Sequence, residues 1–178
     1  MKKIVALMVI VFVMGCTDKT VNFTVDFYDN FDYYTSFPVG PWYSNNACSA
    51  KLVDGSVSIG KGKPCLYLDL NGINYTLSID YKGNGSIFFG IKNDSYYELK
   101  LGSWNLTFCN KTCTYVADVQ DMYDEKWHNV RIVFMDSGIQ VYYDNNIIIN
   151  SKKKSYVESG KIGFSNLLID NVSVKSLE

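Results

Sequence analysis

Carboxyl groups are the side chains of this sequence with the clearest catalytic potential, because glycoside hydrolysis needs two of them beside the bond that breaks. Asp118 and Asp121, close to Asp124, form one acidic cluster, although such a cluster is more often a solvated loop. The single histidine, His128, has no nucleophile beside it, and no Gly-x-Ser-x-Gly motif occurs. The sequence therefore leans against an enzyme, and an unusual glycosidase is the alternative. No two of the four glutamates have the spacing that would place both on one face of a strand: Glu98, Glu125, Glu158 and Glu178.

A binding module needs fewer special residues than an enzyme. Sugars dock on exposed aromatic rings that are flanked by amide and carboxylate groups. Tyr96 and Tyr97 are neighbours in a strand-like segment, so one of them must point away from the core. For each aromatic candidate, packing in the core or against a sheet is the alternative. The candidate ligand-binding residues are Trp42, Tyr96, Tyr97 and Trp104.

Four further cysteines indicate disulfide bonds if the protein is exported. They are Cys48, Cys65, Cys109 and Cys113. Cys109 and Cys113 flank a segment that reads as a tight turn, which would leave the other two as the second pair. Four cysteines nevertheless allow three connectivities, and the sequence does not choose among them. Zinc is the alternative, but the spacing is not Cys-x-x-Cys and only one histidine is present.

The start of the chain has the composition of an export signal. Two lysines precede an apolar run over residues 4–14, which is too short to span a bilayer and fits a cleaved leader. The run ends Val-Met-Gly-Cys, which resembles the prokaryotic lipobox, and an ordinary signal peptide is the alternative. We predict a membrane anchor through a lipid on Cys16. The expected organisation is a signal peptide over residues 1–15, a lipidated tether over 16–20 and one domain over 21–178.

Composition narrows the partners further. The net charge is −1 and no basic stripe is visible, which argues against nucleic acid as a partner. Asn-x-Ser/Thr triplets exceed the roughly two that random placement would give, which favours N-glycosylation of an exported protein. The alternative is turn chemistry, since Asn beside Ser or Thr also suits loops. The acceptors are Asn22, Asn74, Asn84, Asn93, Asn105, Asn110 and Asn171.

The elements that must position these residues are short strands. Runs of alternating apolar and polar residues recur about every ten residues, and no apolar period of 3.6 is sustained, which predicts an all-β, two-sheet antiparallel sandwich. Asp54-Gly55 between two such runs is a strong hairpin signal. After Trp127, Val130 and Ile132 share one face of a predicted strand, and the residues between them share the other.

Three pairs of segments resemble the concanavalin A-like lectin/glucanase superfamily, which includes laminin-G domains. The middle pair reads Trp-His-Asn-Val-Arg-Ile and then Gly-Ile-Gln-Val-Tyr-Tyr-Asp-Asn, like the Trp-His-x-Val-x-Ile and Gly-x-x-Val-Tyr-x-Asp-Gly strand pair of that group. The opening and closing pairs resemble its Phe-x-Asp-x-Phe with Pro-x-Gly-Trp, and its Gly-x-Ile-Gly-Phe with Ile-Asp-Asn-Val-x-Val. The segments are residues 27–31 with 38–42, 127–132 with 138–145, and 160–164 with 169–174.

The resemblance implies a jelly roll of two stacked sheets, with outermost strands from both ends of the chain. It implies that Trp127 is a buried anchor. Glucanases of this superfamily carry a Glu-x-Asp-x-(x)-Glu strand, which this sequence lacks. In some relatives an aspartate at the place of Asp170 helps to hold a structural calcium ion, and Asp29 is the other acid that could reach it. Calcium at these two residues is the one cofactor that the resemblance suggests.

These observations predict a surface-anchored, extracytoplasmic binding module that recognises carbohydrate or neighbouring components of the cell envelope. A structural cell-surface glycoprotein without a sugar ligand is one alternative. A glycoside hydrolase-like enzyme is the other.

Overall fold

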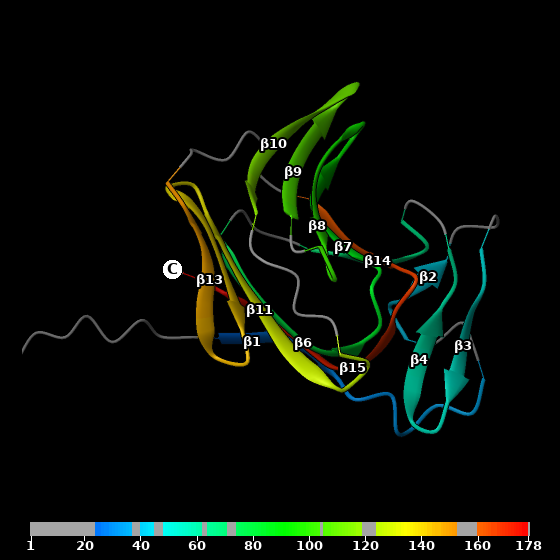
Figure 1. The fold of residues 1–178 in the computed structure, drawn as a ribbon. Coiled ribbons are helices and arrows are strands. Elements are labelled where there is room, and N and C mark those ends of the chain that lie inside the picture. The colour runs from blue at the N-terminus through cyan, green and yellow to red at the C-terminus, as the bar shows by residue number, and fades with distance from the viewer. Residues whose placement is uncertain are drawn as a thin grey trace, which may run out of the picture.

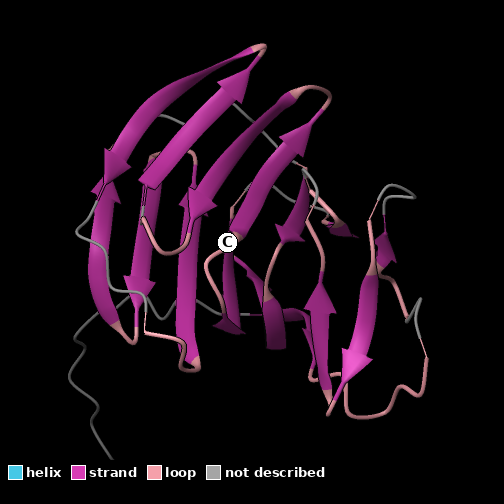
Figure 2. Ribbon diagram, turned by 45° about the vertical axis from the view of Figure 1, so that its right-hand side comes forward, coloured by secondary structure: helices cyan, strands magenta, loops and turns pink. Residues whose placement is uncertain are grey.

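The computed structural model describes residues 24–36, 40–44, 48–61, 64–70, 74–103, 105–118, 124–152 and 160–177. The predicted signal peptide, Cys16, Asn22 and Trp104 lie outside these ranges. Strands joined by turns make up the described residues, which contain no helix (Figure 2). Accordingly, nothing in those ranges forms a helix long and apolar enough to cross a membrane.

One layer is an eight-stranded antiparallel sheet. Its strands lie in the order β13-β12-β11-β6-β15-β4-β3, and β1 joins the same sheet by pairing with β15. The bounds are β1 Thr24–Asp29, β3 Ala50–Val53, β4 Ser56–Ile59, β6 Tyr75–Lys82, β11 His128–Met135, β12 Gly138–Tyr143, β13 Asn146–Ser151 and β15 Leu168–Ser176.

The other layer is a seven-stranded antiparallel sheet in the order β10-β9-β8-β7-β14-β5-β2. Figure 1 shows the two sheets as separate layers, with β6, β11, β13 and β15 in one and β7 to β10 in the other. The predicted two-sheet sandwich is therefore confirmed. The bounds are β2 Tyr43–Ser44, β5 Leu66–Asp69, β7 Ser86–Lys92, β8 Ser95–Lys100, β9 Asn105–Asn110, β10 Thr112–Asp118 and β14 Lys161–Ser165.

A shared core lies between the sheets because side chains alternate along each strand. In β6, for example, Leu77 is fully buried, whereas its neighbour Ser78 faces outward and is only partly buried. Aromatic rings connect the layers. Phe89 of β7 stacks on Tyr97 of β8 with centroids 5.4 Å apart and meets the ring of Phe134 of β11 at 5.6 Å.

The last strand lies inside its sheet, and the resemblance was wrong to place it at an edge. β15 has nine residues, which is long enough to pair with β6 along one side and with β4 and β1 along the other. Its register against β6 shifts between Asp170 and Ser173. The edge strands are β13, β3 and β1 in one sheet, since β1 pairs with β15 alone, and β10 and β2 in the other. The implied edge position is therefore right for the first strand and wrong for the last.

Two disulfide bonds resolve the connectivity that the sequence left open. Cys109 and Cys113 face each other across β9 and β10 and are bonded, as the tight-turn interpretation predicted. The other bond joins Cys48, which precedes β3, to the fully buried Cys65, which precedes β5. This second bond ties the two sheets together, since β3 and β5 belong to different layers.

Candidate functional site

A row of paired residues crosses the outer face of the seven-stranded sheet. Tyr67 of β5 pairs with Gly163 of β14, and Gly163 pairs with Phe88 of β7. Phe88 pairs with Glu98 of β8, which pairs in turn with Thr107 of β9. Directly opposed residues of antiparallel strands lie on the same face. Because the residues that alternate with this row fill the core, the row faces away from it.

Phe88 and Glu98 are buried although they belong to this outer face, with exposed fractions of 1% and 5%. Oε1 of Glu98 accepts a hydrogen bond from the Ser86 hydroxyl at 2.9 Å. None of the ion pairs formed by the described residues includes Glu98. Burying a carboxylate without a cation partner costs stability. This burial makes Glu98 a candidate ligand-binding residue.

A hollow of about 530 Å³ opens beside Glu98. Its polar lining offers hydrogen-bond donors and acceptors together, which suits a ligand that is rich in hydroxyl groups. No second carboxylate is among the described residues that line it, so the two-acid arrangement of glycoside hydrolysis is not seen there. The polar lining residues are Lys61, Asn84, Ser86, Glu98, Lys100, Ser103, Ser165 and Asn166.

Tyrosine rings border the same face. The ring of Tyr96 lies edge-on to Phe88 with centroids 5.6 Å apart, and it helps to line a separate hollow of about 450 Å³. Tyr43 and Tyr67 stack almost parallel at 5.2 Å. The Lys161 ammonium lies 5.0 Å from the centroid of the Tyr43 ring. The face thus combines aromatic planes with a carboxylate and several amides.

The predicted ligand-binding aromatic residues differ in orientation and in exposure. Tyr96 points outward and Tyr97 points inward, as their adjacency in a strand predicted. Tyr97 is 2% exposed and packs on Phe89, and Trp42 is also 2% exposed, so neither ring has a free face on which a sugar could dock. The prediction of ligand contact was therefore wrong for Tyr97 and Trp42. For Tyr96 it stays a prediction, and Trp104 lies outside the described residues.

Asp29 explains why Trp42 is buried. Its Oδ2 accepts hydrogen bonds from the Trp42 indole nitrogen at 2.9 Å and from the Tyr34 hydroxyl at 3.1 Å. Its Oδ1 accepts one from the Phe31 backbone nitrogen at 2.9 Å. Asp29 is itself only 7% exposed. It therefore organises the segment after β1 by satisfying three donors.

The predicted calcium site has little support among the described residues. Both oxygens of Asp29 already accept hydrogen bonds, and the described residues contain no group of three or more side chains placed to hold a metal ion. Burial, and then the negative charges of Asp32, Asp80 and Asp29, raise the pKa of Asp170. No ion pair among the described residues includes Asp170, so no cation offsets this repulsion there. Calcium binding at Asp29 and Asp170 stays a prediction.

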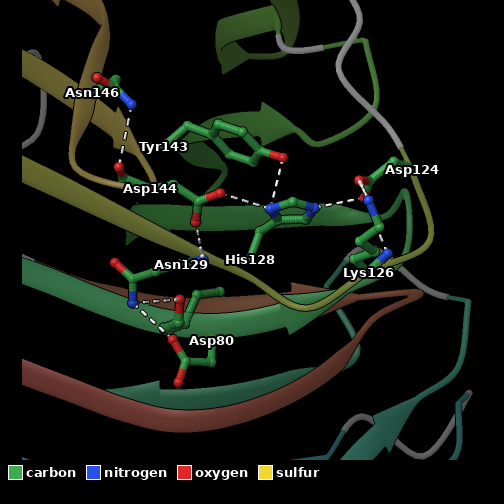
Figure 3. Close-up of polar contacts among 9 residues, drawn as sticks. Asp80, Asp124, Lys126, His128, Asn129, Tyr143, Asp144 and Asn146 are labelled. Atoms are coloured by element: carbon green, nitrogen blue, oxygen red, sulfur yellow. Dashed lines mark hydrogen bonds and ion pairs between the residues drawn. The ribbon is translucent and has the colours of Figure 1, made fainter.

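A second polar cluster surrounds His128 at the start of β11 (Figure 3). Its Nδ1 lies 2.8 Å from Asp144 Oδ2 and 2.7 Å from the Tyr143 hydroxyl, and its Nε2 lies 2.6 Å from Asp124 Oδ1. The Lys126 ammonium also contacts Asp124, at 3.0 Å. Both ring nitrogens are thus engaged, so His128 acts as a clamp between the segment before β11 and the turn after β12.

The opposite charges of His128 and its two aspartate neighbours stabilise each other. Burial lowers the pKa of His128, but the hydrogen bonds and charges of Asp124 and Asp144 outweigh burial and raise the pKa above its ordinary value of 6.5. The hydrogen bond from His128, followed by those from Lys126, holds the pKa of Asp124 well below its usual range. Asp124 of the predicted acidic cluster belongs to this clamp, and Asp121 and the Asp118 side chain lie outside what the structure describes.

Trp127 is 44% exposed and is not the buried anchor that the resemblance implied. The physical reason is that His128 takes the inward position. Its ring lies 6.2 Å from that of Tyr81 and 4.7 Å from that of Tyr143. Trp127 instead borders an open hollow of about 420 Å³ whose other lining residues are Asp80, His128, Asn129, Asp144, Asp170 and Asn171.

The described glycosylation acceptors differ in accessibility. Asn84, Asn93 and Asn110 are exposed, whereas Asn74, Asn105 and Asn171 are partly buried. Asn171 is the most constrained, because its amide nitrogen donates to Asp80 and its oxygen accepts from the Tyr28 hydroxyl. Glycosylation at any of these positions stays a prediction.

Solved structures share this fold at low sequence identity. One, described by the words "Prominent members of the human gut microbiota express endo-acting O-glycanases to initiate mucin breakdown", has a TM-score of 0.62 and 13% identity, and the match covers 87% of this chain and 100% of that chain. The fold is a jelly roll found in carbohydrate-active proteins. No protein-family model matches the sequence, and no curated protein matches it.

Two further structures belong to longer proteins. A GlcNAcα1-4Gal-releasing endo-β-galactosidase from Clostridium perfringens has a TM-score of 0.59 and 12% identity, with coverage of 86% of this chain and 62% of that chain. A family 43 glycoside hydrolase from Bacillus licheniformis has a TM-score of 0.62 and 10% identity. That match covers 84% of this chain and 39% of that chain. This chain spans less than two thirds of either protein, and identities this low establish the fold alone.

The sequence alone marks Tyr96 as a candidate ligand-binding residue, but it marks Glu98 only as an acid without a partner at catalytic spacing. A signal was available, since Glu98 follows Tyr96 by two residues and therefore shares its face of the strand. The partner Phe88 had no comparable signal. It occurs in a continuous apolar run, and such a run does not reveal which residues face outward.

Proposed function

We propose that this protein binds carbohydrate through the outer face of its seven-stranded sheet, with Glu98 at the centre of the site. One observation carries the proposal. Glu98 is 5% exposed, has no ion-pair partner among the described residues, and borders a polar hollow on a face that also presents Tyr96. The similarity in fold to carbohydrate-active proteins supports the same ligand class.

The chemistry of the site suits a sugar with free hydroxyl groups. A carboxylate accepts hydrogen bonds from two adjacent hydroxyls, and the amides of Asn84 and Asn166 both donate and accept. The Tyr96 ring offers an apolar plane to the carbon–hydrogen face of a sugar. Since the hollow beside Glu98 shows one carboxylate, recognition without bond cleavage is the activity that we infer.

We also propose a location for this binding activity, which rests on the lipobox-like segment of the sequence. A lipid on Cys16 would hold the domain at the outer surface of a membrane, where its ligand would be an extracellular glycan or a glycosylated envelope component. Metabolic labelling with a lipid precursor tests this part. Label that persists in a Cys16→Ala variant would contradict it.

A glycan array followed by calorimetry tests the binding site. The array should include neutral galactosides and O-glycans, the classes named for similar structures. We expect Glu98→Gln to weaken binding of the best glycan about tenfold or more, in line with a hydrogen bond to a charged group. Glu125→Gln is the matched control, because Glu125 is exposed and lies outside the hollow. Equal affinities for Glu98→Gln and the control would overturn the proposal.

A further inference from the structure

The outer face of the eight-stranded sheet carries a cation that the proposed sugar site does not use. Arg131 of β11 pairs with Tyr142 of β12 on one side and with Ser78 of β6 on the other. Its chain neighbours Val130 and Ile132 are fully buried, so the Arg131 side chain faces outward. This face lies on the opposite side of the sandwich from Glu98.

The Arg131 guanidinium is held in place by an aromatic ring, but one of its hydrogen-bond donors has no acceptor. Its guanidinium carbon lies 4.2 Å from the centroid of the Tyr142 ring, which fixes the plane of the group. Its Nε is buried and has no hydrogen-bond partner, and no ion pair among the described residues includes it. The Tyr142 hydroxyl is directed elsewhere, because it donates to Gln140 at 3.0 Å. A buried donor without an acceptor costs free energy, and a small rotation of the guanidinium toward an arriving anion would recover it.

The surroundings of Arg131 favour an anion that also carries hydroxyl groups. A hollow of about 530 Å³ lies over this face, and its described lining includes Arg131, Lys175, Ser78 and Ser173 but no acid. The acids in the adjoining row are Asp80 and Asp170, which pair across β6 and β15. Asp170 Oδ1 accepts a hydrogen bond from the Asn171 backbone nitrogen at 2.7 Å. Asp80 is held by side-chain amides. Its two oxygens accept hydrogen bonds from Asn129 at 2.8 Å and from Asn171 at 2.9 Å, so it is engaged by amides.

We propose that this hollow binds a sugar that bears a carboxylate, such as a uronic or sialic acid. The planar guanidinium of Arg131 matches a carboxylate through two parallel hydrogen bonds. Ser78 and Ser173 are opposed across β6 and β15 and supply hydroxyls for the sugar ring, and Val133 and Met135 supply an apolar surface. The site is independent of Glu98, so this proposal and the proposed function can fail separately.

Nuclear magnetic resonance of the purified protein tests the proposal. The probes are N-acetylneuraminic acid and methyl glucuronide, with methyl glucoside as the neutral counterpart of the latter. We expect the two acids to shift the Arg131 Nε–H resonance and the neutral sugar to leave it unchanged. No shift with either acid would overturn the proposal. Equal competition by inorganic sulfate would also overturn it, because the hollow would then bind any oxyanion without reading the sugar.

Variants separate the contribution of the guanidinium fork from that of charge. Arg131→Lys keeps the positive charge but loses the planar fork, and it should weaken binding of the acids about tenfold. Lys175→Gln, a second variant in the hollow, should weaken binding of the acids severalfold. It keeps the proposal testable if Arg131→Lys misfolds. Lys82→Gln is the control, because Lys82 is an exposed cation of β6 that does not line the hollow. Equal losses in all three variants would contradict a site centred on Arg131.

Discussion

The His128 and Asp144 side chains lie 2.8 Å apart and join the start of β11 to the turn that follows β12. The opposite edge of the same ring contacts Asp124 at 2.6 Å. A ring held between two carboxylates is favoured in its charged form. His128 is the only histidine in the sequence, so its ionisation is the main side-chain titration with an ordinary pKa near neutrality.

The free energy of unfolding is expected to fall as the pH rises from about 5.5 to about 8. Because the folded-state pKa of His128 is raised, its stabilising contribution is complete below the unfolded value of 6.5 and is lost as the pH rises through the folded value. Asp124 has a lowered pKa, so its contribution is present above its ordinary value and is lost only in stronger acid. Urea unfolding across this pH range measures the effect.

His128→Gln is the matched variant for this prediction. It should cost on the order of 1 kcal/mol at about pH 5.5, in line with hydrogen bonds to charged groups, and it should flatten the pH profile. A variant with the wild-type slope would show that another group titrates and would contradict the clamp.

Tyr96 and Tyr97 provide a matched pair of aromatic substitutions in one strand. Tyr97→Ala should destabilise the protein by about 3–5 kcal/mol, because it leaves a cavity beside Phe89 in the core. Tyr96→Ala should cost much less stability and should instead weaken glycan binding. Thermal unfolding and calorimetry on both variants measure the two effects. Loss of stability in both variants with no change in binding would contradict the assignment of Tyr96 to the ligand face.

The two disulfide bonds should contribute unequally to stability. Cys48 and Cys65 are 17 residues apart, and Cys109 and Cys113 are 4 apart. Loop-closure entropy assigns about 3 kcal/mol to the longer loop and about 2 kcal/mol to the shorter one. Replacing the first pair by serine should cost more for a second reason, because Cys65 is fully buried. Chemical denaturation measures the free energy of unfolding of both variants. An equal loss in the two would contradict a larger contribution from the Cys48–Cys65 bond.

Asp29 should act as a structural acceptor whether or not calcium is present. Asp29→Ala leaves the Trp42, Tyr34 and Phe31 donors without this partner and should cost about 3 kcal/mol. The melting temperature of the wild-type protein should be the same in a calcium chelator and in excess calcium. A clear rise with calcium that is lost in Asp170→Asn would instead establish the ion site that the sequence suggested.

Much of the fold is readable from the chain because strand alternation is local. Asp54 and Gly55 both have positive φ in the turn between β3 and β4, as their residue types predicted. The alternation of β6 and β11 predicted which of their side chains enter the core. It also predicted that Tyr96 and Tyr97 point in opposite directions, although not which of them is buried.

The candidate site was much less readable because it depends on strands that are distant in sequence. Glu98 shares its row with Phe88, Gly163 and Tyr67, which come from three other strands. The burial of Trp42 depends on Asp29, and the exposure of Trp127 depends on His128 taking the inward place. None of these relationships has a periodicity that could be detected along the chain.

The sequence by itself determined the all-β class, most strand positions and the hairpin turns, since these follow from interactions between near neighbours. The tertiary structure alone decided which residues lie side by side on each outer face, which cysteines bond and where β15 enters its sheet. The physical reason is that pairing between distant strands sets both register and burial. One carboxylate on an outer face can then be buried while a tryptophan remains exposed.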